Sequence, residues 1–234
     1  GHIRGYAVEG EAARQVTEAF AAKQNSRGGF LFAVGDGNHS LATAKTCWEN
    51  IKKSGKFTEE QLKTHPARHA LVEICNLHSE ALEFKPIHRL LTNIDVKDML
   101  SFFEAEITKQ GLESTEGDEI VFEYVESGSC TAPIKNFGIN ITNRGDRLPV
   151  EILQGILDKY LETHDNVEID YIHGDEALHG LVKETKGCGI FLQSIDKSTL
   201  FPAINAGGVL PRKTFSIGEA NEKRYYMECH KISM

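Results

Sequence analysis

FLFAVGDGNHSLATAK, residues 30–45, is the stretch in which we expect the functional centre of this chain to lie. Its first five residues form an apolar run typical of a short strand, and a helical period begins at Leu41. Between them, GDGNHS at 35–40, hereafter the box, has the composition of a turn. Because a helix start carries unpaired N–H groups and partial positive charge, we predict a strand-turn-helix that holds a phosphate or a similar anion.

The side chains of the box add chemistry to this backbone. Gly35 and Gly37 allow a ligand to approach the main chain closely. Asp36 and His39 are two groups that can move protons or bind a metal. The members that can cap the helix or donate to an anion are Asn38 and Ser40. The alternative is a plain Asx turn followed by a capped helix, although such a turn needs no imidazole.

Composition and charge exclude several classes of protein. The 234 residues carry 26 Lys and Arg against 34 Asp and Glu, a net charge of −8, which argues against a dedicated DNA binder. No run approaches the roughly 20 apolar residues of a membrane span, and no signal peptide opens the chain. Five scattered cysteines without a CxxC pair indicate buried free thiols in a reducing cytoplasm. We expect a cytoplasmic fragment whose N-terminal region is missing.

Helical and strand-like segments alternate along the sequence. Helices are predicted at 9–25, 41–54, 58–65, 95–110, 149–164, 175–185 and 198–206, and strands at 30–34, 68–77, 119–126, 167–173, 187–194 and in the tail after 211. This order predicts a mixed α/β or α+β fold in which helices flank a mixed sheet. A soft boundary at 111–117 divides a phosphate- or nucleotide-binding lobe, 1–110, from a C-terminal α/β lobe, 118–234.

Three ordered segments carry a resemblance to a known family. GDGNHSLATAK at 35–45 resembles an ADGHHRYETAL signature, HALVEICNLHSEALEFKPIHRLL at 69–91 resembles a strand followed by a PTHR motif, and LPRKTFS at 210–216 resembles an MPxKSTYF segment. These signatures belong to family 1015 of the domains of unknown function, and the chain is similar to its C-terminal portion. It departs from the signature at Asn38, where the family commonly has His, and at Ser40, which replaces a phosphate-binding Arg.

The resemblance implies a three-part site and a nucleotide. The box is similar to the helix-start box of the superfamily of ParB, sulfiredoxin and free-serine kinase, where it binds a nucleotide or a catalytic phosphate. His88 and Arg89 stand on the family's His-Arg, and Lys213 and Thr214 stand on its Lys-Ser/Thr. The expected catalytic groups are Asp36, His39 and His88, and the expected cofactor-binding residues are Gly35, Gly37, Asn38, Ser40, Arg89, Lys213 and Thr214.

The implied function is an enzyme that binds a phosphate or nucleotide and acts in phosphoryl transfer or hydrolysis on a small serine-like metabolite. ATP or ADP with Mg²⁺ is the expected cofactor, and a small anionic metabolite or nucleotide is the expected partner. The alternatives are a ParB-like nucleotide-binding regulatory module without turnover, and an inert scaffold in which the box is only a turn and a cap.

The residues outside the box also have interpretations that involve no ligand. PIHR at 86–89 fits a helix started by Pro86 with a surface Arg and a half-buried His. Lys213 and Thr214 fit an exposed loop residue followed by a strand residue. His65 and His69 are four residues apart, as in a helical metal pair, but the intervening Pro66 disfavours a regular helix, so no metal site is expected.

Overall fold

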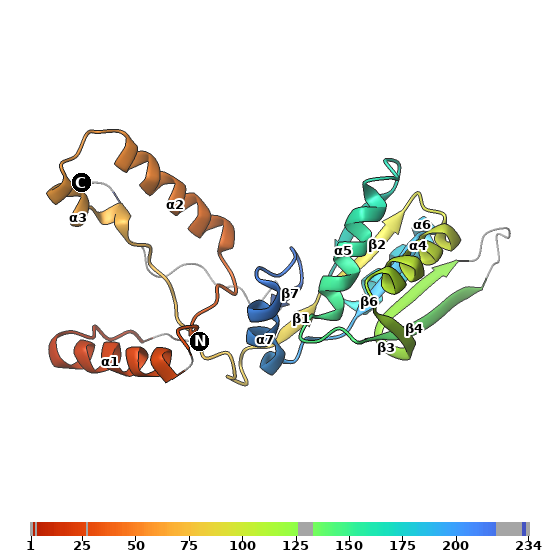
Figure 1. Cartoon of the computed structure of the whole chain (residues 1–234), viewed down its shortest axis with the longest axis horizontal. Coiled ribbons are helices and arrows are strands. Elements are labelled where there is room, and N and C mark those ends of the chain that lie inside the picture. Colours follow the sequence, from red (N-terminus) through yellow and green to blue (C-terminus); the bar gives the residue numbers. More distant parts are fainter. Residues whose placement is uncertain (1, 3, 27, 126–132, 219–230, 233–234) are drawn as a thin grey trace. The chain divides into compact units, whose positions relative to one another are not determined.

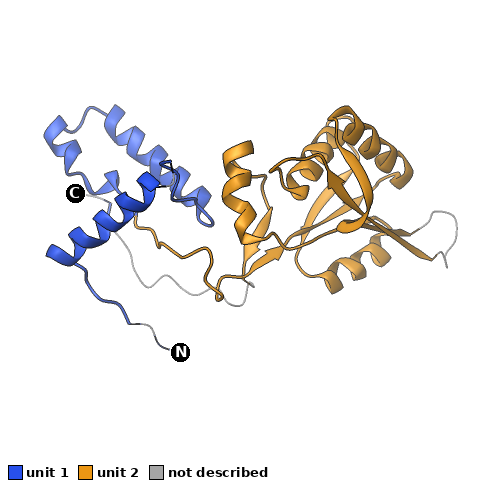
Figure 2. Ribbon diagram, turned by 60° about the horizontal axis from the view of Figure 1, so that its bottom comes forward, with its two compact units in different colours: residues 1–70, 232–234 blue, residues 71–231 orange. Residues whose placement is uncertain are grey.

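The computed structural model describes residues 2, 4–26, 28–125, 133–218 and 231–232. The chain divides into two compact units, residues 1–70 with 232–234 and residues 71–231 (Figure 2). The predicted boundary at 111–117 falls inside the second unit, where it covers the turn after α4 (Val96–Lys109) and the first residues of β3 (Glu113–Val125). The functional division into two lobes stays a prediction.

A five-stranded sheet with the order β4-β3-β6-β2-β5 forms the centre of the second unit (Figure 1). Besides β3, its strands are β2 (His88–Thr92), β4 (Ile134–Thr142), β5 (Glu168–Ile172) and β6 (Cys188–Leu192). The α/β class with flanking helices is confirmed, but every described pairing is antiparallel, so the expectation of a mixed sheet is wrong. The reason lies in the crossovers. Strands joined through a helix, β2 with β3 and β5 with β6 (through α6, Asp175–Thr185), are each separated by an intervening antiparallel strand.

The two faces of this sheet are covered by different helices. α4 and α5 (Pro149–Leu161) pack on one face around a large apolar core that includes Leu91, Phe122 and Ile190. α6 packs on the other face against Leu90. Gly189 permits that approach, because a Cβ at this position would lie 2.6 Å from Val182 Cγ2.

A second, two-stranded sheet lies at the start of β2. β1 (Phe84–Pro86) pairs antiparallel with β7 (Phe215–Ile217), which follows α7 (Lys197–Gly207). The Phe84 and Phe215 rings stack with centroids 4.2 Å apart. The remainder of the predicted tail strand lies largely outside the described residues.

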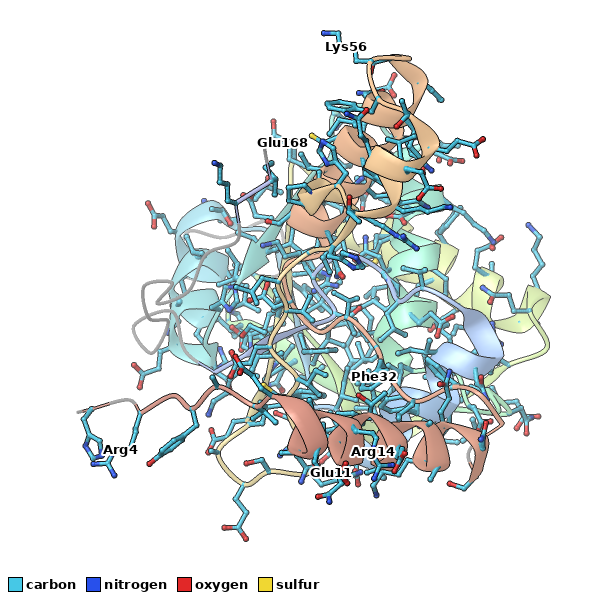
Figure 3. The ribbon with its side chains drawn as sticks, turned by 90° about the vertical axis from the view of Figure 1, so that its left-hand side faces the viewer. Arg4, Glu11, Arg14, Phe32, Lys56 and Glu168 are labelled. Carbon is cyan, nitrogen blue, oxygen red and sulfur yellow. The ribbon has the colours of Figure 1, made fainter. Side chains whose placement is uncertain are left out.

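The first unit is helical. It contains α1 (Gly10–Ser26), α2 (Asn38–Lys53), α3 (Glu59–Lys63) and the short 3-10 helix η1 (Pro66–Arg68). His65 is buried against Trp48 and Phe57, with ring centroids at 5.7 and 4.8 Å. α1 has no buried residue, and its exposed Arg14 (Figure 3) pairs with Glu11 and Glu18.

Two predicted strands are absent from the described structure. Residues 30–34 and 68–77 contain no strand, because neither segment has a ladder partner there, although 66–68 form η1. Several of their apolar side chains are accordingly exposed, with Phe32 at 51% (Figure 3) and Leu71 at 58%. The local pattern is that of a strand, but a strand exists only when a neighbour supplies its hydrogen bonds.

The predicted helices are confirmed with small shifts at their ends; α2 begins at Asn38 rather than Leu41. The expectation of buried thiols is right for Cys188 and wrong for Cys47 and Cys75, which are exposed. Burial raises the pKa of the Cys188 thiol to about 12. Within the described residues, no helix has both the length and the apolarity needed to cross a membrane.

Candidate functional site

The box forms the turn that leads into α2. Gly37 occupies the left-handed region with φ 76°, which favours glycine. The Gly37 N–H donates a hydrogen bond to the Asp36 carboxylate at 2.8 Å. No side chain caps α2, so neither Asn38 nor Ser40 acts as the helix cap that the sequence allowed. A helix that starts without a side-chain cap keeps its first amides for another acceptor, and His39 is exposed beside them.

The second and third motifs are neighbours in space. Pro86 of PIHR is the register partner of Phe215, which follows Lys213 and Thr214. PIHR itself is strand rather than a helix started by proline, since β1 ends at Pro86 and β2 begins at His88. The structure therefore brings PIHR and LPRKTFS together within the second unit, while the box belongs to the first.

His88 and Arg89 lie on opposite faces of the sheet. Successive strand residues alternate in direction. His88 reaches Asp175 of α6, whereas Arg89 reaches Gln154 of α5. The two side chains predicted to act together thus contact different helices and cannot hold one ligand jointly in this conformation.

Arg89 is fully buried, with 0% exposure. Its Nε donates to Gln154 Oε1 at 2.9 Å and its Nη1 donates to the Ile87 carbonyl at 2.5 Å. Gln154 is oriented in turn because its amide donates to Asp158 Oδ1 at 2.8 Å. The guanidinium carbon lies 4.7 Å from the centre of the Tyr171 ring.

This environment leaves the Arg89 charge incompletely compensated. Its Nη2 has no hydrogen-bond partner among the described residues. Desolvation is the main cause that lowers the pKa of Arg89 to about 10, and the nearby Tyr171 and Asp158 only partly oppose it. A buried guanidinium with a missing acceptor is the arrangement that an anionic ligand would complete.

His88 is held through both ring nitrogens. Nδ1 accepts the Leu192 N–H at 3.1 Å, so in the neutral ring Nε2 carries the proton and donates to Asp175 Oδ1 at 2.9 Å. Burial lowers the pKa of His88, and the hydrogen bond to Asp175 opposes this only in part. The geometry gives His88 a structural role between β6 and α6, and a catalytic role for it stays a prediction.

The third motif is a tight turn before β7. Lys213 is exposed and has φ 58°, a left-handed conformation that is uncommon for a residue with a side chain. Thr214 is buried, and its hydroxyl donates to the Pro211 carbonyl at 2.7 Å. The Thr214 hydroxyl is therefore engaged within the turn, whereas the Lys213 side chain extends from a strained position.

Sequence reasoning missed the residues that hold Arg89 and His88. Gln154 interrupts the apolar stripe of α5, and a polar residue at a core position was a signal that could have been followed. Asp175 at the start of α6 follows Gly174, whose φ of 84° sets the turn. Nothing in the sequence pairs either residue with the PIHR motif.

The alternative metal pair has other contacts. His65 Nδ1 accepts the Ala67 N–H at 3.1 Å as the cap of η1, while His69 is exposed. Across the described ranges, no three His, Cys, Asp or Glu side chains are grouped so that they could hold a metal ion. His230, Cys130 and Cys229 lie outside the described residues.

Several solved structures match this chain at low sequence identity. A mutant of free serine kinase in complex with ADP matches with a TM-score of 0.50 at 15% identity, over 88% of this chain and 80% of that one. Free serine kinase in complex with AMP matches with a TM-score of 0.49 at 17% identity, over the same shares of the two chains. A conserved hypothetical protein from Pyrococcus furiosus matches with a TM-score of 0.44 at 17% identity, over 63% of this chain and only 61% of that one.

Comparison at the sequence level identifies the family. No curated protein matches the chain. The family model described as a protein of unknown function, DUF1015, matches residues 1–155, which is more than half of the sequence. The chain therefore belongs to the DUF1015 family.

Proposed function

We propose that the chain binds a phosphate group or a nucleotide and acts in phosphoryl transfer or hydrolysis on a small serine-like metabolite. The observation that carries the proposal is the buried Arg89 guanidinium, whose Nη2 lacks an acceptor among the described residues. An unsatisfied buried donor costs about 1–3 kcal/mol, and more when it is charged. A phosphate oxygen is a partner that suits a guanidinium well, so binding would recover this cost.

Access to Arg89 requires a local opening, because the side chain has no exposed surface. The β1–β7 pair adjoins the start of β2, and the strained Lys213 turn leads into β7. We therefore assign Lys213 as the exposed cation that first meets the anion and Arg89 as the buried cation that a shift of this pair would uncover. Thr214 is a further candidate donor if its bond to Pro211 opens.

The box supplies the backbone part of the proposal. The first amides of α2, together with Gly35, Gly37, Asn38 and Ser40, would hold phosphate oxygens. A nucleotide bound there would supply the transferable phosphoryl group, with Asp36 as the carboxylate that Mg²⁺ prefers. His39 is exposed and would accept the proton of the attacking hydroxyl.

ATP and ADP are the first nucleotides to test, since the free serine kinase mutant that shares the fold is in complex with ADP. At 15% identity this likeness concerns the fold alone. Serine is the first acceptor to test because the box resembles that of a serine kinase.

Substitution of His39 tests the catalytic part. We expect His39→Ala to abolish ADP formation from ATP and L-serine while the circular dichroism spectrum and the ADP affinity stay unchanged. His69→Ala, which removes another exposed histidine of the same unit, is the matched control and should retain activity. Full turnover in His39→Ala would contradict the assignment. Nucleotide binding without turnover in the unaltered chain would favour the ParB-like regulatory module.

A further inference from the structure

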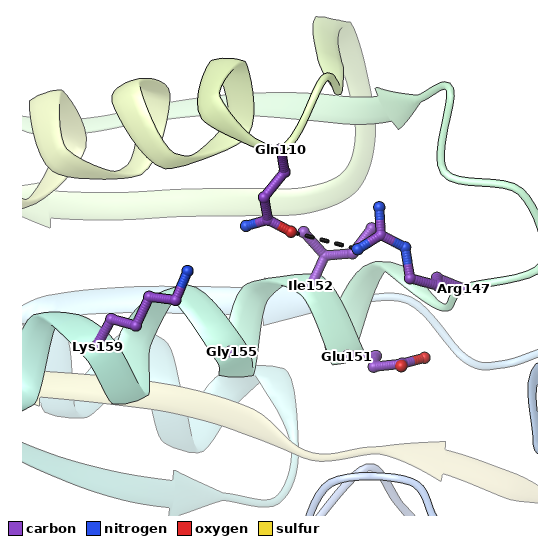
Figure 4. Close-up of a pocket in the computed structure, with 6 residues that line it drawn as sticks. All are labelled: Gln110, Arg147, Glu151, Ile152, Gly155 and Lys159. Carbon is purple, nitrogen blue, oxygen red and sulfur yellow. Dashed lines mark hydrogen bonds between the residues drawn. The ribbon is translucent and has the colours of Figure 1, made fainter. Parts of the chain in front are cut away.

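A small cavity lies between the end of α4 and the outer face of α5 (Figure 4). Its volume is about 200 Å³. None of its residues belongs to the box, PIHR or LPRKTFS. The lining residues are Gln110, Arg147, Glu151, Ile152, Gly155 and Lys159.

Gly155 keeps the floor of the cavity open. It lies inside α5, where glycine is less favourable than alanine. Close packing does not explain its presence, because a Cβ at this position would meet no atom within 4 Å. A large side chain at this lining position would project into the cavity, so glycine preserves the space.

The Gln110 amide presents a donor to the cavity. Its oxygen is already used, because Arg147 donates to it from Nη1 at 3.2 Å. This bond turns the amide nitrogen toward the side of the cavity on which the Lys159 ammonium lies (Figure 4). Gln110 therefore offers an N–H group to a ligand and little acceptor capacity.

Arg147 is a cation without an anionic partner. Its other side-chain bond is a long one, from Nε to the Arg144 carbonyl at 3.5 Å. Within the described ranges, no carboxylate lies within salt-bridge distance of its guanidinium. Nη2 takes part in neither bond, so the guanidinium keeps N–H groups for an anion, and a carboxylate matches its planar fork.

Lys159 is a cation that a ligand can recruit. Its ammonium pairs with Glu106 at 2.6 Å, but Glu106 also pairs with Lys109 at 2.8 Å. One carboxylate thus serves two ammonium groups. Lys159 can turn to a ligand while Glu106 keeps Lys109, so the move leaves no buried carboxylate without a cation.

Glu151 lines the cavity without directing its charge into it. Its carboxylate lies against α7, where a Cβ on Gly207 would be 2.6 Å from Glu151 Oε1. In Figure 4 this carboxylate points away from Gln110 and Lys159. The polar groups aimed at the space are therefore two cations and an amide N–H, which together suit an anion.

We propose that this cavity binds a small dicarboxylate, with one carboxylate on Arg147 and the other on Lys159 and the Gln110 amide. The two cations stand on either side of Gly155 (Figure 4), which matches a ligand with an anionic group at each end. The volume equals that of about seven water molecules in the liquid, which suits a dicarboxylate of similar size. The site does not rest on the proposed phosphate chemistry.

Calorimetric titration of the full chain with succinate tests this inference, in a buffer free of other carboxylates and of phosphate. Monomethyl succinate is the matched probe, because it keeps the length of the ligand and removes one charge. We expect saturable binding of succinate and affinity lower by about tenfold or more for monomethyl succinate, since the ester leaves one cation without its partner.

Glycine variants locate the binding. Gly155→Leu fills the cavity and should abolish succinate binding. Gly180→Leu, at another helical glycine whose Cβ would also meet no atom within 4 Å, should leave it unchanged. Both variants should unfold cooperatively on heating, which verifies that they are folded.

Charge variants identify the ligands. Arg147→Gln and Lys159→Gln should each weaken succinate binding about tenfold. Lys213→Gln is the control, because it changes the net charge equally and removes an exposed cation of the proposed phosphate site. Its affinity for succinate should equal that of the unaltered chain.

Each of the following results would overturn the inference. They are the absence of saturable succinate binding, unchanged binding in Gly155→Leu, equally tight binding of monomethyl succinate, and loss of succinate binding in Lys213→Gln with retention in Arg147→Gln. Titration of the same samples with ADP reports on the phosphate site separately, so failure of one proposal is distinguishable from failure of the other.

Discussion

Pro86 and Phe215 are register partners in the antiparallel pair of β1 and β7, and this single pairing joins two motifs that lie far apart in the sequence. It places the strained Lys213 turn next to the strand that begins at His88 and contains Arg89. Two of the three motifs therefore have a common structural support within the second unit.

Arg89→Met should separate anion binding from stability. Methionine keeps much of the side-chain length but removes the incompletely paired buried charge, and the desolvation cost that this relieves offsets the two hydrogen bonds lost at Gln154 and Ile87. We expect the affinity for ADP to fall about tenfold or more, while the free energy of unfolding in urea stays the same or rises. Arg14→Met, which removes an exposed arginine of α1, is the control. A large loss of stability with unchanged affinity would give Arg89 a purely structural role.

Lys213→Gly should weaken anion binding and stabilise the fold. The left-handed conformation at φ 58° costs a residue with a side chain roughly 1–2 kcal/mol, of which glycine recovers part after its own entropy cost. The free energy of unfolding should therefore rise by up to about 1 kcal/mol, while phosphate affinity measured by calorimetry falls. Equal affinity in this variant would show that the lysine is not an anion ligand.

His88 should make stability depend on pH in a defined direction. Its folded-state pKa lies below the ordinary 6.5, so the unfolded chain takes up a proton first as the pH falls. The stability it contributes is fully present above 6.5 and is lost as the pH falls from there through the lowered folded pKa. Urea denaturation at about pH 7.5 and about pH 5 should show a smaller pH effect in His88→Gln than in the unaltered chain. His69→Gln is the control, and an unchanged pH effect in His88→Gln would refute this role.

Gly189→Ala should destabilise the second unit. The added Cβ would lie 2.6 Å from Val182 Cγ2 and 3.2 Å from Leu178 Cγ, so α6 must shift away from the sheet. Overpacking of this kind costs about 1–3 kcal/mol in unfolding free energy. Gly180 lies on α6 itself, where an added Cβ would meet open space. Gly180→Ala should therefore be stabilising, because alanine is the better helix former. Equal thermal stability of the two variants would contradict the packing argument.

Local signals in the sequence predicted the helices well. The capping box at Thr58 and Gln61 forms in both directions, and Asp95 caps α4 by accepting from the N–H groups of Lys97 and Asp98. These contacts involve residues at most three apart, so short-range pattern is sufficient to find them.

Strands were harder because their stability depends on distant partners. Residues 134–142 form β4 although Asn136, Gly138 and Asn140 weaken the apolar pattern; pairing with β3 overrides this. Residues 30–34 show the opposite error, a good pattern without a ladder. The directions in which neighbouring side chains point also depend on whether a segment becomes a strand. Only the knowledge that PIHR enters a strand shows that His88 and Arg89 face apart.

The candidate site could be predicted in its parts but not in its arrangement. The box was identified from glycine spacing and a helical period, and the Gly37 conformation agrees with that reasoning. The contact between PIHR and LPRKTFS depends on the pairing of β1 with β7, which sequence separation conceals. Gln154, which orients Arg89, could be found only from the packing of α5 on the sheet.

Calorimetric titration of the full chain with ADP and Mg²⁺, repeated for Arg89→Met and Arg14→Met, measures whether Arg89 is an anion ligand. We expect saturable binding in the unaltered chain, affinity lower by about tenfold or more in Arg89→Met, and unchanged affinity in Arg14→Met. No saturable binding in the unaltered chain, or equal affinity in all three, would contradict this role.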